Sequence, residues 1–245
     1  MSTVRILMVD ASPRGYGGTS KLLDVAEAGV RDAGGEPIKV NLREHRIEPC
    51  WGCVSDDVGL CKFPCLRADD DFNKLAEEVL RSDGFIVATP VYWYSVPGPL
   101  KNFIDRMTSL ENMIYHEGRS LLDGKVAGFV VVGADSGVMN VVSYLMVTFN
   151  SMGVLIPPWS MAYSHMADKP ESDEQALRDA YNVGLIVTEA CKVVRGRGPW
   201  YRPNVNVARL AKIASEREAK YSALRALRLG RFKELLGKQT SRQFS

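Results

Sequence analysis

Strand-like apolar runs alternate with helical patterns along most of this chain, and this alternation limits the fold more than any other feature. The apolar runs lie at residues 4–9, 37–40, 84–88, 126–132 and 154–156. The helical patterns lie at residues 19–33, 69–81, 98–109, 138–152 and 172–194. Strands separated by helices pair in parallel, and three of the runs are apolar enough to be covered on both faces. The sequence therefore predicts a doubly wound α/β sandwich with a five-stranded parallel sheet.

The last part of the chain differs from the rest in charge. Residues 195–245 carry 13 Lys and Arg against three Asp and Glu, a net charge of +10, whereas residues 1–194 carry 18 against 26, a net charge of −8. We therefore expect one α/β domain at residues 1–194 and a basic arm and helix at residues 195–245. The apolar residues of this segment keep roughly helical spacing, which favours oligomer contacts over binding to nucleic acid or an anionic membrane.

Other features bear on the compartment. The chain has no run of 18 or more apolar residues, and the first strand-like run begins within three residues of Met1. We therefore expect no membrane span, no signal peptide and a cytoplasmic location. In such a compartment the five cysteines are expected to be thiols, metal ligands or redox groups instead of structural disulfides.

The turn after the first apolar run has the composition of a phosphate site. Residues 11–20 read ASPRGYGGTS and open a helix, whose first N–H groups lack intrahelical partners and lie at the positive end of the helix dipole. The glycine patterns of dinucleotide folds and of phosphate-transferring ATPases are both absent. The hydroxyls of Ser12, Thr19 and Ser20, with Arg14, favour a monophosphate. The alternative is an ordinary surface loop with Thr19 or Ser20 as the helix N-cap.

Two further loops follow predicted strands, where open parallel sheets bind ligands. The loop after the third run holds three consecutive aromatic residues, Tyr92, Trp93 and Tyr94, between two prolines. Such a stiff aromatic ledge suits a flat conjugated ring, although cover for the sheet end or a subunit contact is the alternative. The loop after the fourth run reads GADSG at residues 133–137.

Taken together, these motifs resemble the flavodoxin-like NAD(P)H-dependent FMN reductases, and more narrowly their iron-sulfur flavoprotein branch. The resemblance covers about residues 3–194 and rests on SPRGYGGTSKL at residues 12–22, PVYWYSVPGPLKNFIDR at residues 90–106 and a group of cysteines. It implies a flavodoxin-like sheet of order 2-1-3-4-5, noncovalently bound FMN, NAD(P)H as co-substrate, and a homodimer or homotetramer whose sites a neighbour completes. It also implies three sets of FMN contacts. They are Ser12, Arg14, Thr19 and Ser20 near the phosphate, Pro90, Val91, Tyr92, Trp93, Tyr94 and Ser95 along the isoalloxazine ring, and Ala134, Asp135, Ser136 and Gly137 near its pyrimidine end.

Four cysteines lie between the second apolar run and the next helical pattern. They are Cys50, Cys53, Cys61 and Cys65, with the spacing C-x2-C-x7-C-x3-C. This set suffices to bind one metal centre. The iron-sulfur branch that it resembles has a compact C-x-x-C-x-x-C and a later fourth cysteine, so the spacing here departs from that pattern. A [4Fe-4S] cluster, a structural zinc ion and free thiols stay open, with free thiols favoured.

The combined features predict an NAD(P)H-dependent FMN oxidoreductase that reduces a quinone, flavin, metal or protein acceptor. No side chain has to act as an acid or base, because FMN carries the chemistry, and no catalytic residue is assigned. The first alternative is an electron-transfer protein with FMN and a cysteine-bound cluster but no dedicated small substrate. The second is a cofactor-free structural or regulatory protein.

Overall fold

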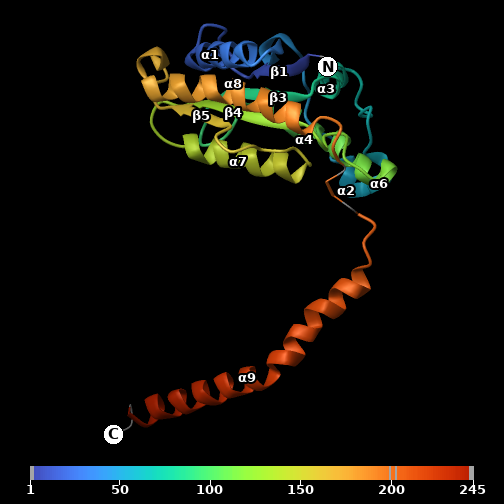
Figure 1. Ribbon diagram of the computed structural model, residues 1–245, viewed down its shortest axis with the longest axis vertical. Helices are drawn as coiled ribbons and strands as arrows, with labels where there is room; N and C mark the ends of the chain where they lie inside the picture. The colour runs from blue at the N-terminus through green and yellow to red at the C-terminus, as the bar shows by residue number, and fades with distance from the viewer. Residues whose placement is uncertain (1–2, 199, 202, 243–245) are drawn as a thin grey trace. The chain divides into compact units, whose positions relative to one another are not determined.

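The computed structural model describes residues 3–198, 200–201 and 203–242, and Figure 1 traces the path of the chain. The chain divides into two compact units, Met1–Pro203 and Asn204–Ser245. The boundary expected from the charge pattern, after residue 194, lies earlier than this division. The intervening segment belongs with the first unit because Arg195 Nε donates to Asp83 Oδ1 at 2.9 Å and Trp200 N donates to Asp123 Oδ2 at 3.0 Å.

The first unit is built on a five-stranded parallel sheet of order β2-β1-β3-β4-β5. The strands are β1 (Val4–Asp10), β2 (Gly35–Asn41), β3 (Gly84–Pro90), β4 (Val126–Val132) and β5 (Met161–Ser164). The three central strands β1, β3 and β4 are buried along nearly their whole length, whereas the edge strand β2 is largely half-buried. Burial on both faces explains why β1, β3 and β4 have continuous apolar sequences. The predicted fold and strand order are confirmed.

The fifth strand is the one strand that the sequence misplaces. Residues 154–156 are not a strand, and Leu155 makes only an isolated bridge with Val126. Two consecutive prolines, Pro157 and Pro158, follow directly. Successive N–H groups of a strand point to opposite sides, so one of the two prolines would leave β4 without a donor. The chain therefore leaves the sheet after one bridge and pairs with β4 only from Met161 onward.

Helices cover both faces of this sheet, as Figure 1 shows. One face carries α1 (Gly18–Asp32) and α8 (Glu174–Val194), and the other carries α3 (Phe72–Arg81), α4 (Gly98–Arg106) and α7 (Val138–Ser151). The shorter elements are η1 (Leu42–Glu44), α2 (Cys53–Asp56), η2 (Val58–Leu60), α5 (Thr108–Glu111), α6 (Met113–Glu117) and η3 (Pro170–Ser172). Asp173 caps the start of α8, because its side chain accepts from Ala176 N at 3.1 Å.

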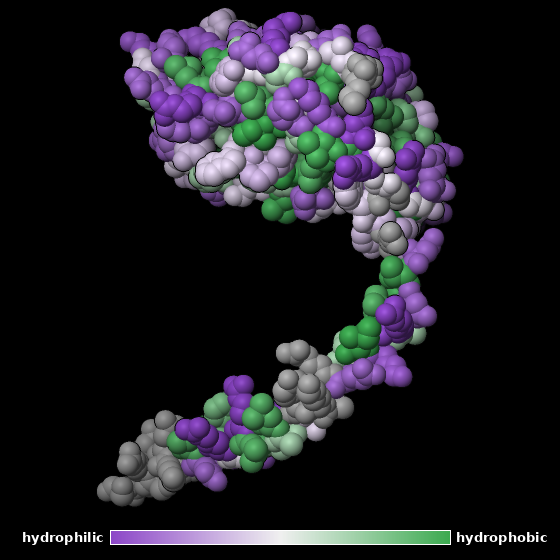
Figure 2. Space-filling view, viewed as in Figure 1, coloured by the Kyte–Doolittle hydropathy of each residue, from purple (hydrophilic) through white to green (hydrophobic). Residues whose placement is uncertain are grey.

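The second unit contains one long helix, α9 (Val207–Arg242). Apolar side chains such as Leu210, Leu224 and Leu235 are exposed along it. Figure 2 shows hydrophobic and hydrophilic residues interspersed along this helix. In the part of the chain that the structure describes, none of the helices has the length and apolar character that crossing a membrane requires.

Helices α1 and α8 approach each other closely at two glycines. A Cβ atom on Gly29 would lie 2.0 Å from Tyr181 O, and one on Gly184 would lie 1.9 Å from Ala26 O. Both obstacles are backbone atoms, which cannot turn aside as a flexible side chain can. The two helices must therefore separate to admit even a methyl group.

We predict that Gly184→Ala lowers the free energy of unfolding by about 1–3 kcal/mol, the range typical of overpacked cores. Urea denaturation provides the measurement. Gly98→Ala is the matched control, because a Cβ on Gly98 meets no atom within 4 Å and should leave stability nearly unchanged. Equal denaturation midpoints for the two variants would contradict the close approach.

Candidate functional site

The loops that follow β1, β3 and β4 meet at one edge of the sheet. These strands are neighbours in the parallel sheet, so their carboxyl ends lie side by side. Hydrogen bonds join the starts of the loops: Ala11 N donates to Ala88 O at 2.9 Å, and Val91 N donates to Val132 O at 3.0 Å. The structure thus brings the three predicted sets of FMN contacts to the same edge.

The loop after β1 is organised around the carbonyl oxygen of Arg14. This oxygen accepts hydrogen bonds from Ser12 Oγ at 2.8 Å and from Gly17 N at 3.1 Å. Thr19 is buried in the first turn of α1. The helix N-cap is Gly17, so the alternative reading with Thr19 or Ser20 as the cap is wrong.

The start of α1 suits an anion. Gly17 offers no side chain to cap the helix, and the first turn holds no acidic residue. The N–H groups of this turn have no intrahelical partners, so they can donate to a bound phosphate. This donor set fits the phosphate of FMN.

Asp10 and Arg43 lie against this loop, although neither was among the residues predicted for the site. Asp10 is buried at the end of β1, where Oδ1 accepts from Ser12 N at 2.9 Å and Oδ2 accepts from Ser20 Oγ at 2.7 Å. Arg43, in η1, lies with Nη1 3.6 Å from Asp10 Oδ2. A charged residue directly at the end of an apolar run was the available signal for Asp10. No sequence pattern indicated Arg43, because it lies in the connection after β2 and comes close to this loop only in the folded chain.

The aromatic loop after β3 is a tight two-residue turn. Tyr92 N donates to Ser95 O at 2.8 Å, and Ser95 N donates to Tyr92 O at 3.0 Å. The two central residues, Trp93 (φ 48°) and Tyr94 (φ 64°), both lie in the left-handed region. This geometry is that of a hairpin turn usually made by Asn and Gly, so it is strained for aromatic residues. Trp93 is 95% exposed, which leaves its ring free to contact a ligand or partner.

Tyr94 connects this turn to the loop after β4. A Cβ atom on Gly137 (φ 85°) would lie 2.8 Å from Tyr94 Cδ1, so only glycine admits the ring there. Ser136 Oγ donates to Tyr94 Oη at 3.2 Å, and Asp135 Oδ1 accepts from Ser136 N at 2.6 Å. The predicted contacts at residues 134–137 therefore adjoin the aromatic ledge.

The four cysteines of the second candidate site line one small cavity. Cys50, Cys53, Cys61 and Cys65 share it with residues that include Arg67 and Arg106. Cys61 is buried, and burial, followed by the neighbouring thiols with Cys53 foremost, raises its pKa to about 12. Cys61 is therefore a neutral thiol near pH 7 unless a metal displaces its proton. Among the described residues, no three His, Cys, Asp or Glu side chains are gathered closely enough to hold a single ion.

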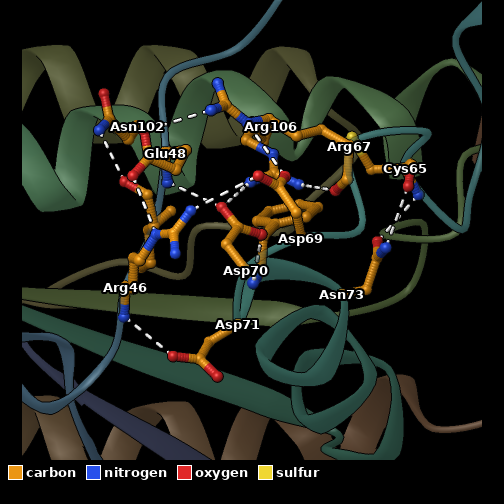
Figure 3. A network of polar contacts seen from close by, with 12 residues as sticks. Arg46, Glu48, Cys65, Arg67, Asp69, Asp70, Asp71, Asn73, Asn102 and Arg106 are labelled. Atoms are coloured by element: carbon orange, nitrogen blue, oxygen red, sulfur yellow. Dashed lines mark hydrogen bonds and ion pairs between the residues drawn. The ribbon is translucent and has the colours of Figure 1, made fainter.

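Hydrogen bonds fix the chain on either side of these cysteines, as Figure 3 shows for Cys65. Asn73 Nδ2 donates to Cys65 O at 3.0 Å, and Asn73 Oδ1 accepts from Cys65 N at 2.8 Å. Asn112 Nδ2 donates to Cys61 O at 2.6 Å, and His116 Nε2 lies 3.0 Å from the same oxygen. Asn73 lies eight residues from Cys65, whereas Asn112 and His116 lie more than 50 residues from Cys61. No sequence motif indicated these contacts.

A buried ion pair lies beside the cysteine cavity (Figure 3). Arg106 and Asp70 have no exposed side-chain surface, and Arg106 Nη1 donates to Asp70 Oδ2. Arg106 Nη2 donates to the Arg67 carbonyl oxygen, and its guanidinium carbon lies 4.3 Å from the centre of the Phe72 ring. Arg106 Nε, in contrast, has no hydrogen-bond partner among the described residues.

The helical pattern expected at residues 69–81 would place three aspartates, Asp69, Asp70 and Asp71, in the first turn of a helix, but they precede α3. That helix begins at Phe72, and Asp71, its N-cap, makes no side-chain cap. Asp70 Oδ2 accepts from Glu48 N at 2.7 Å, and Asp71 Oδ2 accepts from Arg46 N at 2.9 Å. Burial tends to raise the pKa of Asp70, but its hydrogen bonds to backbone N–H groups and to Arg106 hold that pKa below the usual range. Asp70 is therefore a carboxylate that secures the start of the cysteine segment.

We predict that Asp70→Asn lowers the free energy of unfolding by about 3–5 kcal/mol at pH 7, because it leaves the Arg106 charge buried without a counterion. The lowered pKa means that Asp70 stabilises the fold above its unfolded pKa. The contribution is lost as pH falls through the folded pKa. Urea denaturation should therefore show that the difference in free energy of unfolding between wild type and Asp70→Asn narrows below about pH 4. Asp69→Asn, at a more exposed carboxylate, is the control and should cost less than about 1 kcal/mol. A stability difference between wild type and Asp70→Asn that does not change with pH would contradict this role for Asp70.

Comparisons with solved structures agree with the fold. The structure of RosB with bound 8-demethyl-8-formylriboflavin-5'-phosphate matches with a TM-score of 0.68 at 17% identity, over 88% of each chain. An NADH:FMN oxidoreductase in its apo form matches with a TM-score of 0.53 at 19% identity, over 80% of this chain and 92% of the other. At these identities the two matches show a shared fold.

Sequence comparisons show the family. An iron-sulfur flavoprotein of Archaeoglobus fulgidus is 32% identical over 193 residues, which cover 78% of this chain and 80% of the relative. An iron-sulfur flavoprotein of Methanocaldococcus jannaschii is 25% identical over 203 residues, which cover 78% of this chain and all of the relative. A family model described as NADPH-dependent FMN reductase matches residues 4–168. The chain belongs to the NADPH-dependent FMN reductase family of oxidoreductases.

Proposed function

We propose that this protein binds FMN at the carboxyl edge of its sheet and oxidises NAD(P)H to reduce a quinone, flavin, metal or protein acceptor. The observation that carries the proposal is the meeting of three loops with complementary chemistry. One loop offers helix N–H groups and hydroxyls, the second a rigid aromatic turn, and the third polar groups against that turn. When bound, FMN supplies the centre that accepts a hydride and passes electrons on.

The residues of the protein bind and orient the cofactor in this proposal. The phosphate lies at the start of α1, near Ser12, Arg14, Thr19 and Ser20. Ser12 and Ser20 already hydrogen bond within the loop, so they shape it while backbone N–H groups and Thr19 supply donors.

The ring lies along the loop after β3 and ends near the loop after β4. The backbone of Pro90, Val91, Tyr92, Trp93, Tyr94 and Ser95 flanks it, and Ala134, Asp135, Ser136 and Gly137 face its pyrimidine end. The N–H groups of Val91, Tyr92 and Ser95 already donate within the protein, so the turn offers the ring those of Trp93 and Tyr94. The turn holds these donors in place before the ligand binds, which lowers the ordering cost of binding.

A second candidate function is electron transfer through FMN and a cysteine-bound [4Fe-4S] cluster. The four cysteines are not gathered around a single ion, but a [4Fe-4S] cluster needs only one cysteine per iron. They line one cavity, and Arg106 Nε beside it has no hydrogen-bond partner among the described residues, which favours an anionic centre. The curated relatives named above are iron-sulfur flavoproteins. Helix α4 starts after the aromatic loop and ends at Arg106, and its nine residues span roughly 13 Å. One helix thus joins the two candidate sites.

Helix α9 fits the expected role in a homodimer or homotetramer. Its apolar residues are exposed within its own unit, and an isolated helix gains most of its stability from packing. A neighbouring copy is the partner that we infer for this surface.

The first test of the function is the spectrum and turnover of the purified protein. We expect flavin absorbance that persists through desalting, and NADH or NADPH oxidation that rises at least tenfold when a quinone is added. Tyr94→Gly removes the ring held by Ser136 and Gly137, so FMN should dissociate faster from this variant. A protein that stays colourless after incubation with FMN would overturn the proposal.

The second test concerns the cysteines. After anaerobic reconstitution with iron and sulfide, we expect broad absorbance that dithionite bleaches and about four iron atoms per chain. Replacement of Cys50, Cys53, Cys61 and Cys65 by serine should abolish this absorbance. Cys191→Ser is the matched control, because Cys191 is buried in α8 away from the cavity. Iron binding that survives the fourfold replacement would exclude a centre at these cysteines.

A further inference from the structure

The buried carboxylate of Asp10 lies at the end of β1, directly before the proposed phosphate site. Asp10 is 4% exposed, and both of its oxygens are hydrogen bonded to the loop that would bind the phosphate. A dianionic phosphate placed there would be repelled by this carboxylate, because like charges repel each other strongly at short distance. The site therefore needs a cation near Asp10.

Arg43 is the cation that the fold places against this carboxylate. It lies in η1, directly after β2, and β2 pairs with β1 so that Asn41 is opposite Asp10. Its Nη1 is 3.6 Å from Asp10 Oδ2 and donates to Asn41 Oδ1 at 3.2 Å, while Nη2 donates to Glu44 Oε1 at 3.0 Å. These contacts hold the guanidinium in place without a ligand.

The same guanidinium lies over the phosphate loop itself. A Cβ atom on Gly15 would lie 2.8 Å from Arg43 Nη2 and 3.1 Å from Arg43 Cζ, so the missing side chain of Gly15 makes room for the arginine. Arg14 differs, because in the part of the chain that is described its side chain makes no hydrogen bond or ion pair that would position it. Arg43 is thus the prepositioned cation of the loop.

We propose that Arg43 binds the phosphate of the flavin and, paired with Asp10, makes the site selective for FMN over flavins that lack the phosphate. This inference rests on the proposed function, since it assumes that FMN occupies the loop. Guanidinium groups bind phosphate oxygens with two parallel hydrogen bonds, and the exposed Glu44 carboxylate is the partner that a phosphate would replace. Asp10 keeps the guanidinium over the loop and offsets its charge when the site is empty.

The test compares FMN with riboflavin, which has the same ring but no phosphate. Fluorescence titration should show that Arg43→Gln raises the Kd for FMN about tenfold or more and leaves the Kd for riboflavin unchanged, because only the phosphate loses a charged partner. Increasing salt should weaken FMN binding more in the wild type than in this variant. Arg31→Gln is the matched control, since Arg31 is an exposed arginine paired with Glu27 at the far end of α1, and it should change neither Kd.

A second variant separates charge from structure. Asp10→Asn in the Arg43→Gln background removes the buried negative charge, so it should recover part of the lost FMN affinity if repulsion is the reason that a cation is needed. Thermal unfolding of each variant shows whether it folds, and Gly15→Ala, which should displace Arg43, gives an independent readout with the same loss of FMN selectivity.

The outcomes distinguish this inference from the proposed function. If the wild type binds FMN tightly and Arg43→Gln binds it equally well, the role of Arg43 is wrong while the function stands. Equal weakening of FMN and riboflavin binding would also overturn the role, because it would indicate a general structural effect. A wild type that binds neither flavin overturns the function and the inference together.

Discussion

The charge of Arg106 must be compensated where it lies, because an arginine cannot lose its proton inside the protein. Asp70 provides the counterion, and the Arg67 carbonyl and the Phe72 ring occupy two further sides of the guanidinium. These partners bring α4, the start of α3 and the end of the cysteine segment to one point. The arrangement of that segment therefore depends on this buried pair together with the hydrogen bonds from Asn73 and Asn112. Arg106 also lines the neighbouring cavity.

Asp10 fixes the loop after β1 in the way that Asp70 fixes the cysteine segment. A carboxylate at the end of a central strand receives one hydrogen bond from the backbone of its own loop and one from the start of α1. The loop is thereby fixed before any ligand arrives, and the helix N–H groups point into a space that no acidic side chain of the first turn occupies. The carboxylate of Asp10 can lie beside an anion site because the guanidinium of Arg43 is close enough to offset its charge.

The sequence predicted the layers of the fold better than the contacts within them. The continuous apolar runs of β1, β3 and β4 reflect burial on both faces, which is a local signal, and the order of the sheet followed from the family resemblance. The position of β5 was wrong because an apolar tripeptide before Pro157 and Pro158 satisfies the strand pattern yet cannot continue a ladder. The sequence also predicted FMN contacts in three loops that meet, but Arg43 and Asn112 act across long separations in the chain. No pattern along the chain records such pairs.

The turn at Trp93 and Tyr94 suggests why its side chains matter more than its backbone. Two residues in the left-handed region cost about 1–2 kcal/mol each relative to glycine, and an Asn-Gly pair would make the same turn with much less strain. The hydrogen bonds between Tyr92 and Ser95 and the contact of Tyr94 with Gly137 hold the turn against this cost. Tyr94 is used internally, whereas Trp93 contributes almost nothing to the packing of its own chain, being 95% exposed. Strain that is retained for an outward-facing ring is explained most simply if that ring contacts a second molecule at the mouth of the site.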